Sequence, residues 1–199
     1  MWIAKEEENE MKDKVFCKKC GHLCVETYEG DIKRKSCPDC GFIYYQNPFP
    51  CISTLVVDDS NRVLLGLRGK ASIYADKWCL PCGYIEYNET YIEAACRETK
   101  EETGVVIRPK GIISVVSNQF ENGVNSMVVT ILAEPESQNV TAGDDIVEAG
   151  WFDLDSELPE LAFEADQYII NEYKRAKEEN RELETLSLLG GSFKAQIRV

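Results

Sequence analysis

The chain has 199 residues, a formal net charge of −13 and nine cysteines. This acidic balance disfavours nucleic acid as a partner, because phosphate binding needs clustered Lys and Arg. The longest apolar run is too short to span a bilayer, and the acidic start resembles neither a signal peptide nor a transit peptide. We therefore expect a cytoplasmic protein without a membrane partner, whose cysteines are metal ligands and free thiols.

Composition divides the chain into four segments. A polar leader covers residues 1–14, a cysteine-rich segment covers 15–46, the main domain covers 47–180, and a C-terminal appendage covers 181–199. A chain of this length holds one full globular domain and a small additional unit.

The cysteine-rich segment contains two CxxC pairs, Cys17 with Cys20 and Cys37 with Cys40. Their separation matches the pattern of a four-thiolate zinc site. The sequence therefore predicts a zinc ribbon with a structural Zn²⁺, and disulfides or free thiols are the alternatives. Four protein ligands leave the ion no open position, so we assign it no catalytic role.

The residues between the two pairs predict a β-hairpin that turns at Gly30. His22 and Cys24 lie close enough to replace a ligand, although a surface position is the simpler interpretation of His22. Residues 32–35 form the only cationic cluster of the segment, and a solvated hairpin edge explains it. A nucleic-acid role for the ribbon is therefore not favoured.

The main domain alternates between strand and helix patterns. Apolar, β-branched residues at 51–57 and 62–67 flank a polar turn and predict a second hairpin. A final helix is expected at 162–186, because apolar residues recur there at helical spacing. Further strands are expected at 105–109, 111–117, 126–134 and 148–154, with a polar loop at 135–145.

Residues 90–102 predict a helix between these strands. Thr90 and Glu93 form a capping box at its start, and Gly104 suits the left-handed position that ends a helix. The helix therefore has both of its boundaries marked in the sequence.

Glu98, Glu101 and Glu102 fall on neighbouring turns of one face of this helix. Like charges at this spacing repel, and Arg97 can pair with Glu93 and Glu101. Bound Mg²⁺ or Mn²⁺ would offset the remaining repulsion. The alternative is an exposed acidic face on a surface helix, and the helix alone does not decide between the two.

The spacing of residues over the longer stretch 83–105 favours the metal site over the exposed acidic face. Residues 83–105 resemble the Nudix box, the signature of Nudix hydrolases, and the resemblance extends over roughly residues 40–175. One position that is usually aliphatic holds Thr99. The matching positions are Gly83, Glu89, Arg97, Glu98, Glu101, Glu102, Gly104 and Val105.

The resemblance implies an α/β/α sandwich around a mixed sheet, in the α/β (α+β) class. It also implies hydrolysis of a nucleoside diphosphate linked to another group, with water attacking phosphorus. The rivals are a non-catalytic ligand-sensing module and the removal of nucleotide caps from RNA.

The resemblance also implies roles for individual residues. Glu98, Glu101, Glu102 and the Gly83 carbonyl would hold Mg²⁺ or Mn²⁺, and Arg97 would orient the glutamates. Glu89 would fasten the loop to the helix. The general base would be Glu101, Glu102 or the downstream Glu148, for which a solvated strand edge is an equally good interpretation.

The ribbon narrows the resemblance to zinc-ribbon members that act on NADH, FAD or ADP-ribose. The NADH subgroup has an SQPWPFPxS-type motif after the box, which VSNQFENGVNSMVV (116–129) lacks. The resemblance thus implies a small nucleotide diphosphate as the substrate. It also implies a homodimer as one option, because dimers are common in the family. Candidate contacts, each with a plain structural alternative, are Arg68, Lys70, Trp78 and Phe120.

The entry to the box contains a third CxxC pair, Cys79 with Cys82. The family commonly has Trp-x-Leu-Pro-Gly-Gly here, so Cys82 replaces the first glycine. We interpret the pair as two independent cysteines, with a redox dithiol as the alternative. Cys82 would then sit next to Gly83 and influence substrate fit or sensitivity to oxidation.

Overall fold

The computed structural model describes residues 14–119 and 124–179. These residues belong to two compact units, Met1–Asn47 and Pro48–Val199. We call the described part of the first unit the ribbon and that of the second the main domain.

The ribbon contains a three-stranded antiparallel sheet in the order β1-β2-β3. The predicted hairpin is confirmed, with Gly30 at positive φ in its turn. The interior is small and consists largely of cysteine side chains. The strands are β1 (Val25–Glu29), β2 (Ile32–Ser36) and β3 (Ile43–Tyr44).

The main domain contains seven strands and two helices in its described residues. One sheet has the order β7-β4-β9-β8 and the other β10-β5-β6. The β4–β9 pair is parallel and the other pairs are antiparallel, so the first sheet is mixed. The elements are β4 (Phe49–Val56), β5 (Arg62–Arg68), β6 (Trp78–Cys79), β7 (Cys82–Tyr84), α2 (Tyr91–Thr103), β8 (Ile107–Gln119), β9 (Asn125–Pro135), β10 (Ile146–Asp153) and α3 (Glu164–Glu178).

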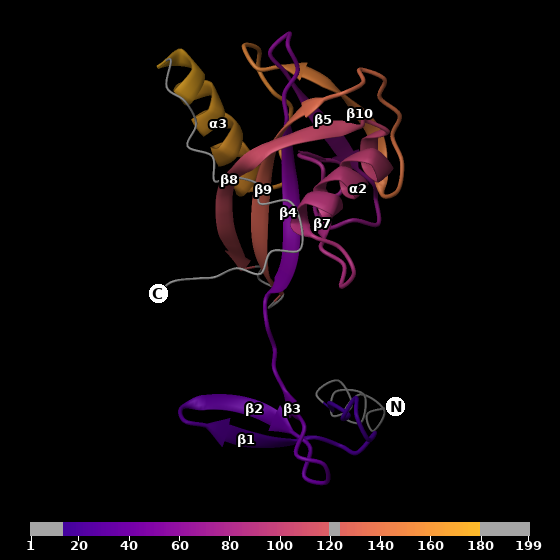
Figure 1. Cartoon of the computed structure of the whole chain (residues 1–199), viewed down its shortest axis with the longest axis vertical. Helices are drawn as coiled ribbons and strands as arrows, with labels where there is room; N and C mark the ends of the chain where they lie inside the picture. The colour runs from indigo at the N-terminus through magenta and orange to yellow at the C-terminus, as the bar shows by residue number, and fades with distance from the viewer. Residues whose placement is uncertain (1–13, 120–123, 180–199) are drawn as a thin grey trace, which may run out of the picture. The chain divides into compact units, whose positions relative to one another are not determined.

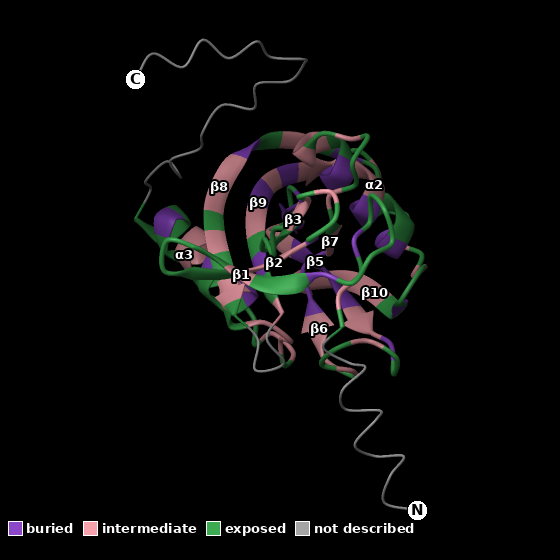
Figure 2. Cartoon of the chain, turned by 90° about the horizontal axis from the view of Figure 1, so that it is seen from below, coloured by how far each residue is buried: buried purple, intermediate pink, exposed green. Residues whose placement is uncertain are grey.

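The strands lie between the two helices, with α2 and α3 on opposite sides (Figure 1). Leu55 packs in a cluster that includes Ile169 of α3. Val56, the next residue of β4, packs in a second cluster against which Cys96 of α2 lies. Successive strand residues point to opposite faces, so β4 supplies both layers of the core. Buried residues occur on the strands and on both helices (Figure 2). The predicted α/β/α sandwich is confirmed.

The hairpin predicted for residues 51–57 and 62–67 is wrong. The chain does turn there, because the Asp58 carboxylate accepts hydrogen bonds from the backbone N–H groups of Ser60 and Arg62. Apart from one bridge at the turn, however, the strands separate into different sheets. β4 pairs with β7 at Cys51–Ser53 on one edge and with β9 along the other, whereas β5 pairs with β6 and β10.

The strands predicted at 105–109 and 111–117 form the single strand β8. Its pairing with β9 shifts register between Pro109 and Gly111, and again between Ile112 and Ser114. Such irregularities let a strand accommodate a proline, which cannot donate a ladder hydrogen bond. The strand therefore continues past Pro109.

The other predicted elements are present with shifted bounds. α2, β9, β10 and α3 correspond to the ranges 90–102, 126–134, 148–154 and 162–186. The last residues of the predicted final helix, 180–186, lie outside the described residues. Neither described helix is long and apolar enough to cross a membrane.

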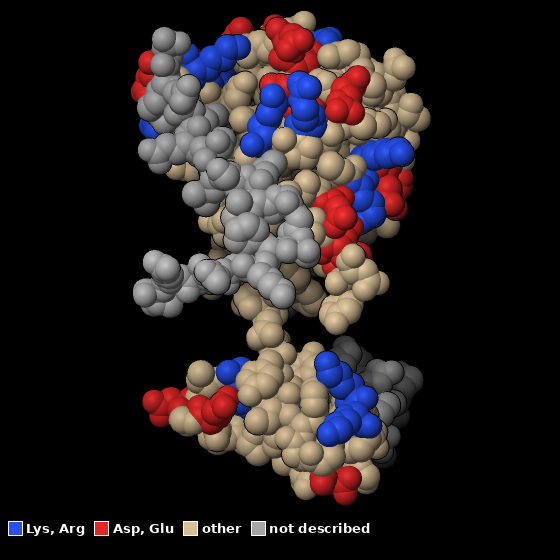
Figure 3. Space-filling model, in the orientation of Figure 1, with Lys and Arg blue, Asp and Glu red and all other residues tan. Residues whose placement is uncertain are grey.

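Charged side chains of both signs are interspersed on the visible face of the main domain (Figure 3). Several charged residues of the main domain form ion pairs, such as Arg108 and Lys110 with Glu134. These pairs are exposed, and exposed pairs contribute about 0–1 kcal/mol each. Most of the acidic residues on this face therefore need no functional explanation.

Candidate active site

Helix α2 is built as its sequence predicts. Thr90 Oγ1 accepts a hydrogen bond from the Glu93 N–H, and the Glu93 carboxylate accepts one from the Thr90 N–H. Gly104 ends the helix with a φ of 71°. Because Glu93 is engaged in this cap, it is not the partner of Arg97.

Arg97 instead joins α2 to the preceding loop. Its guanidinium makes two short contacts to Glu89, at 2.6 and 2.9 Å, and also contacts Glu98 at 2.8 Å and Glu101 at 2.9 Å. It donates to the Tyr84 carbonyl as well. The hydrogen bonds to Glu89, the largest effect, raise the pKa of Arg97 further above its ordinary value. Arg97 is therefore a fixed cation beside the acidic face of α2.

Glu98 and Glu102 are the buried members of that face, at 8% and 2% exposure. Burial raises the pKa of Glu98, and it raises the pKa of Glu102 to about 9. The Glu102 carboxylate accepts one hydrogen bond, from the Cys82 N–H at 3.0 Å. Glu98 has Arg97 as a partner, whereas Glu102 has no cationic partner among the described residues. A bound cation suits this pair, because an additional opposite charge would favour their ionised forms.

Gly83 packs directly against Glu98. A Cβ atom at Gly83 would overlap the Glu98 carboxylate, so a larger residue here would displace that carboxylate. The backbone of Gly83 consequently lies next to the buried carboxylate, as expected of a possible carbonyl ligand.

Glu101 differs from the other two glutamates. Its side chain is 52% exposed, it forms an ion pair with Arg97, and it does not line the cavity described below. Among the described residues, the carboxylate oxygens of Glu98, Glu101 and Glu102 do not form a group in which all three lie within 4.8 Å of one another. The geometry thus fits a divalent cation held by Glu98 and Glu102 better than one held by all three.

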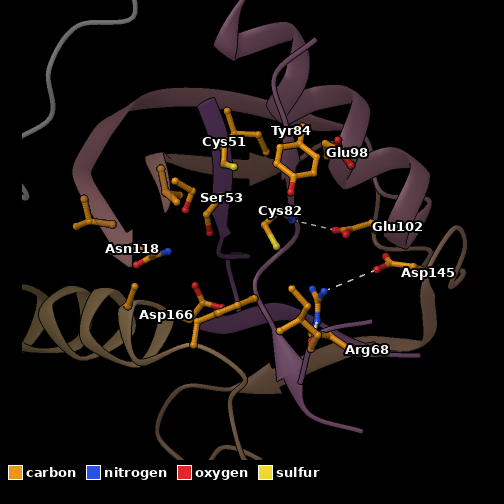
Figure 4. Close-up of a pocket in the computed structure, with 18 of the residues that line it drawn as sticks. Cys51, Ser53, Arg68, Cys82, Tyr84, Glu98, Glu102, Asn118, Asp145 and Asp166 are labelled. Atoms are coloured by element: carbon orange, nitrogen blue, oxygen red, sulfur yellow. Dashed lines mark hydrogen bonds and ion pairs between the residues drawn. The ribbon is translucent and has the colours of Figure 1, made fainter. Parts of the chain in front are cut away.

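The buried glutamates open onto a cavity of about 340 Å³. Strands β4 and β8, helix α3 and the loop before β10 form its other walls. Its acidic side carries Glu98, Glu102 and Asp145, its opposite side carries Asn118 and Asp166, and Ser53 and Cys82 lie between them (Figure 4).

Four carboxylates of this cavity were not predicted, namely Glu86, Asp144, Asp145 and Asp166, and two of them, Asp144 and Asp145, share one loop. Their loop is held against α2, since the Gly143 N–H donates to the Glu102 carbonyl and a Cβ at Gly143 would overlap the Glu101 carbonyl. Asp145 accepts from Ser72 at 2.8 Å. Two consecutive aspartates after a glycine were the available signal in the sequence.

The other predicted contacts are only partly brought together. Arg68 lines the cavity, and its guanidinium lies over the Phe163 ring. Trp78 packs edge-on against Phe152 in the core, which is the packing position expected as the alternative to a substrate contact. Lys70 and Glu148 are exposed and do not line the cavity. Phe120 lies outside the described residues.

The third CxxC pair lies at the cavity wall. Cys82 lines the cavity, whereas Cys79 is fully buried and accepts a weak hydrogen bond from Arg68 at 3.7 Å. None of the nine cysteines forms a disulfide. Cys82 therefore contributes a side chain to the wall directly before Gly83.

In the ribbon, the four paired cysteines converge. Their sulfur atoms all lie within 4.8 Å of one another, and three of the pairs are 3.4–3.5 Å apart. Disulfide sulfurs would be about 2.05 Å apart, whereas Zn–S bonds of about 2.3 Å in a tetrahedron give about 3.8 Å. The donor set fits a structural Zn²⁺ held by Cys17, Cys20, Cys37 and Cys40.

Neither alternative ligand belongs to this four-sulfur group, but His22 forms a second possible ligand group with Cys20 and Asp39. His22 is exposed and its imidazole lies 3.5 Å from Asp39. Cys24 is buried beside the cluster but is not one of its four members.

The model of the NUDIX domain matches residues 48–173, so this chain belongs to the Nudix family. The crystal structure of a NUDIX hydrolase from Nitrosomonas europaea superimposes with a TM-score of 0.75 and 27% sequence identity, covering 83% of this chain and 93% of that one. The resemblance inferred from the box is therefore confirmed.

The curated relatives that match this chain are named for two different activities. An ADP-ribose pyrophosphatase from Methanocaldococcus jannaschii is 33% identical over 123 residues, which are 61% of this chain and 71% of that protein. The NAD-capped RNA hydrolase NudC from Haemophilus influenzae is 32% identical over 152 residues, 76% of this chain. Those residues make up 56% of NudC, so the chain spans little more than half of that relative.

Proposed function

We propose that this chain hydrolyses the pyrophosphate bond of a nucleoside diphosphate linked to a second group, with water attacking phosphorus. The observation that carries this proposal is the burial of Glu98 and Glu102 at the wall of a cavity. Maintaining two buried carboxylates destabilises a fold, and a cation site on a diphosphate-binding wall gives that burial a use.

Glu98 and Glu102, with the Gly83 carbonyl and the predicted Glu101, would hold Mg²⁺ or Mn²⁺. A bound divalent cation would neutralise diphosphate charge and acidify the attacking water. Arg97 positions the glutamates through its contacts to Glu89 and Glu98.

Two further residues of the cavity take part in the proposal. Arg68 supplies a guanidinium that can bind a phosphate oxygen. Asp144 replaces Glu148 as the downstream candidate for the general base, because it lines the cavity and Glu148 does not. A base must lie within hydrogen-bond reach of the attacking water or be joined to it through one water.

ADP-ribose, FAD and NADH are the candidate substrates. The 33% identity to an ADP-ribose pyrophosphatase supports the first of them. The chain lacks the motif of the NADH subgroup at 116–129, which argues against NADH.

Removal of an NAD cap from RNA is the second candidate function. The similarity to the NAD-capped RNA hydrolase NudC covers a longer stretch of this chain than the NUDIX domain model does. This similarity argues against excluding nucleic acid on the basis of net charge alone. The homodimer and the cytoplasmic location remain predictions.

One panel of assays tests these proposals. The protein is incubated with Mg²⁺ or Mn²⁺ and ADP-ribose, FAD, NADH or NAD-capped RNA, and mononucleotide products are separated by chromatography. We expect products from at least one small dinucleotide. Binding of a ligand without any product from the panel would instead support the sensing module. Product from capped RNA in preference to free NADH would support the second function.

A further inference from the structure

The cavity has a polar side that the chemistry at phosphorus does not use. Ser53 comes from β4, Asn118 from β8 and Asp166 from α3. Asn118 and Asp166 lie across the cavity from the acidic wall formed by Glu98 and Glu102, and Ser53 lies between the two sides (Figure 4). Three elements that are distant in the sequence thus place polar side chains in the part of the cavity that runs from its middle to the side opposite the acidic wall.

Ser53 is the first sign that this end receives a ligand. The residue is 3% exposed, and its Oγ is buried without a hydrogen-bond partner among the described residues. Its side chain points into the cavity (Figure 4). A buried polar group without a partner is unfavourable, so a ligand with a polar edge would complete it.

Asp166 is the second sign. It is 4% exposed and lines the cavity from the first turn of α3. The Leu80 N–H donates to its Oδ2 at 3.0 Å, which fixes the orientation of the carboxyl.

The charge of Asp166 is not balanced by an ion pair in the described residues. Arg68 contacts the Ile73 carbonyl, the Cys79 sulfur and Asp145 instead. Burial accordingly raises the pKa of Asp166 to about 7. A hydrogen-bond donor from a ligand would stabilise the ionised form.

Apolar side chains also line the cavity, among them Val116, Val128, Phe163 and Ile169. Pockets of this kind use apolar walls for affinity and a few polar groups for orientation.

We propose that Ser53, Asn118 and Asp166 form a specificity site for the heterocycle of the substrate, with Asp166 accepting an N–H of an amino group on that ring. The exocyclic amine of adenine and the carboxamide of nicotinamide both present such a group. The inference deepens the proposed function, because it identifies which part of the dinucleotide the same cavity reads.

The test is a substrate pair that differs only in the amino group. At pH 8, kcat/KM is measured for ADP-ribose and for its hypoxanthine analogue, which has an oxygen in place of the amine. The wild type should prefer the amino form by at least about tenfold, since a site built to bind a donor rejects an analogue lacking it. Asp166→Asn should lower this ratio to about one or reverse it, because a carboxamide can donate to that oxygen.

For NADH the same comparison has two arms. One analogue carries hypoxanthine at the adenine end, and the other carries nicotinic acid at the nicotinamide end. The analogue whose relative turnover Asp166→Asn improves identifies the ring that occupies the site. If Asp166→Asn improves none of the three analogues, the inference is overturned.

Controls separate recognition from folding. The carboxamide oxygen introduced by Asp166→Asn can still accept the Leu80 N–H, so this variant should fold. Asp58→Asn removes another buried carboxylate, 6% exposed, which lies outside the cavity, and it should leave the amino preference unchanged. An equal loss for both members of the pair in Asp166→Asn would mean a structural role and would overturn the inference. Asn118→Ala should reduce the preference in the same direction.

Binding calorimetry keeps this inference distinct from the proposed function. With Glu102→Gln, the affinity for ADP-ribose and for its hypoxanthine analogue is measured without turnover. A preference for the amino form in binding, with no hydrolysis by the wild type, supports the specificity site while the proposed function fails. Hydrolysis of ADP-ribose and NADH at the same kcat/KM as all three analogues supports the proposed function and overturns the specificity site.

Discussion

The ribbon and the main domain both gather groups that are anionic when ionised, but with opposite consequences for folding. In the ribbon, four cysteines make up much of a very small interior, with little apolar surface around them. In the main domain, three apolar clusters form the core, and the buried glutamates lie at its margin. A cation is thus expected to stabilise the fold of the ribbon and to serve chemistry in the main domain.

The largest effect should follow from removing one zinc ligand. Structural zinc contributes about 10–16 kcal/mol in small domains, so Cys37→Ser should unfold residues 15–46 and abolish zinc binding. Hydrogen exchange should show protection lost there and retained in the main domain. Cys24→Ala is the matched control, since Cys24 is buried beside the cluster without belonging to it. One zinc per chain in Cys37→Ser would contradict the four-sulfur site.

The next effect concerns the buried glutamates. Glu98→Gln and Glu102→Gln should each lower kcat by about a thousandfold, equivalent to about 4 kcal/mol of transition-state stabilisation. Glu101→Gln should lose much less, because Glu101 is exposed and paired with Arg97.

Stability should change in the opposite direction to activity in these variants. Without added divalent cation, Glu102→Gln should raise the free energy of unfolding of the main domain by about 1–3 kcal/mol, since a carboxylate that is costly to bury is removed. Chemical denaturation measures this free energy of unfolding.

The kinetic prediction has its own contradicting outcome. Equal losses of kcat at Glu98, Glu101 and Glu102 would show that Glu101 is a full member of the site.

A smaller effect is expected for the general base. Asp144→Asn should lower kcat about a hundredfold or more, a typical loss for general-base catalysis, whereas Glu148→Gln should change it less than about twofold. Steady-state kinetics of both variants on the best substrate measures the difference. A large loss in Glu148→Gln would restore the residue chosen from the sequence.

The last effect is the pH dependence of stability. The pKa of Asp166 is raised to about 7 by burial, so the folded state retains a proton that the unfolded chain releases near pH 4. The stabilising contribution is present below about pH 4 and is lost as the pH rises to about 7, at up to about 1.4 kcal/mol per pH unit. The unfolding free energy of Asp166→Asn minus that of the wild type should therefore rise over this window. A flat difference would mean that Asp166 is ionised without cost.

Short-range features could be predicted from the sequence. The capping box of Thr90 and Glu93, the left-handed Gly104 and the hairpin at Gly30 each depend on contacts within a few residues. The same holds for the paired cysteines, because each CxxC turn places two thiols on one side whatever the rest of the chain does.

The tertiary structure alone decided which distant groups meet. β4 pairs with β9 rather than with its neighbour β5 because pairing is selected by the packing of the whole sheet, not by proximity along the chain. A register shift between Ile146 and Glu148 accompanies the placement of Asp144 in the cavity and of Glu148 outside it. Ser53, Asn118 and Asp166 share one cavity only because β4, β8 and α3 pack together. No local pattern encodes that meeting, since it depends on burying apolar surface across the entire domain.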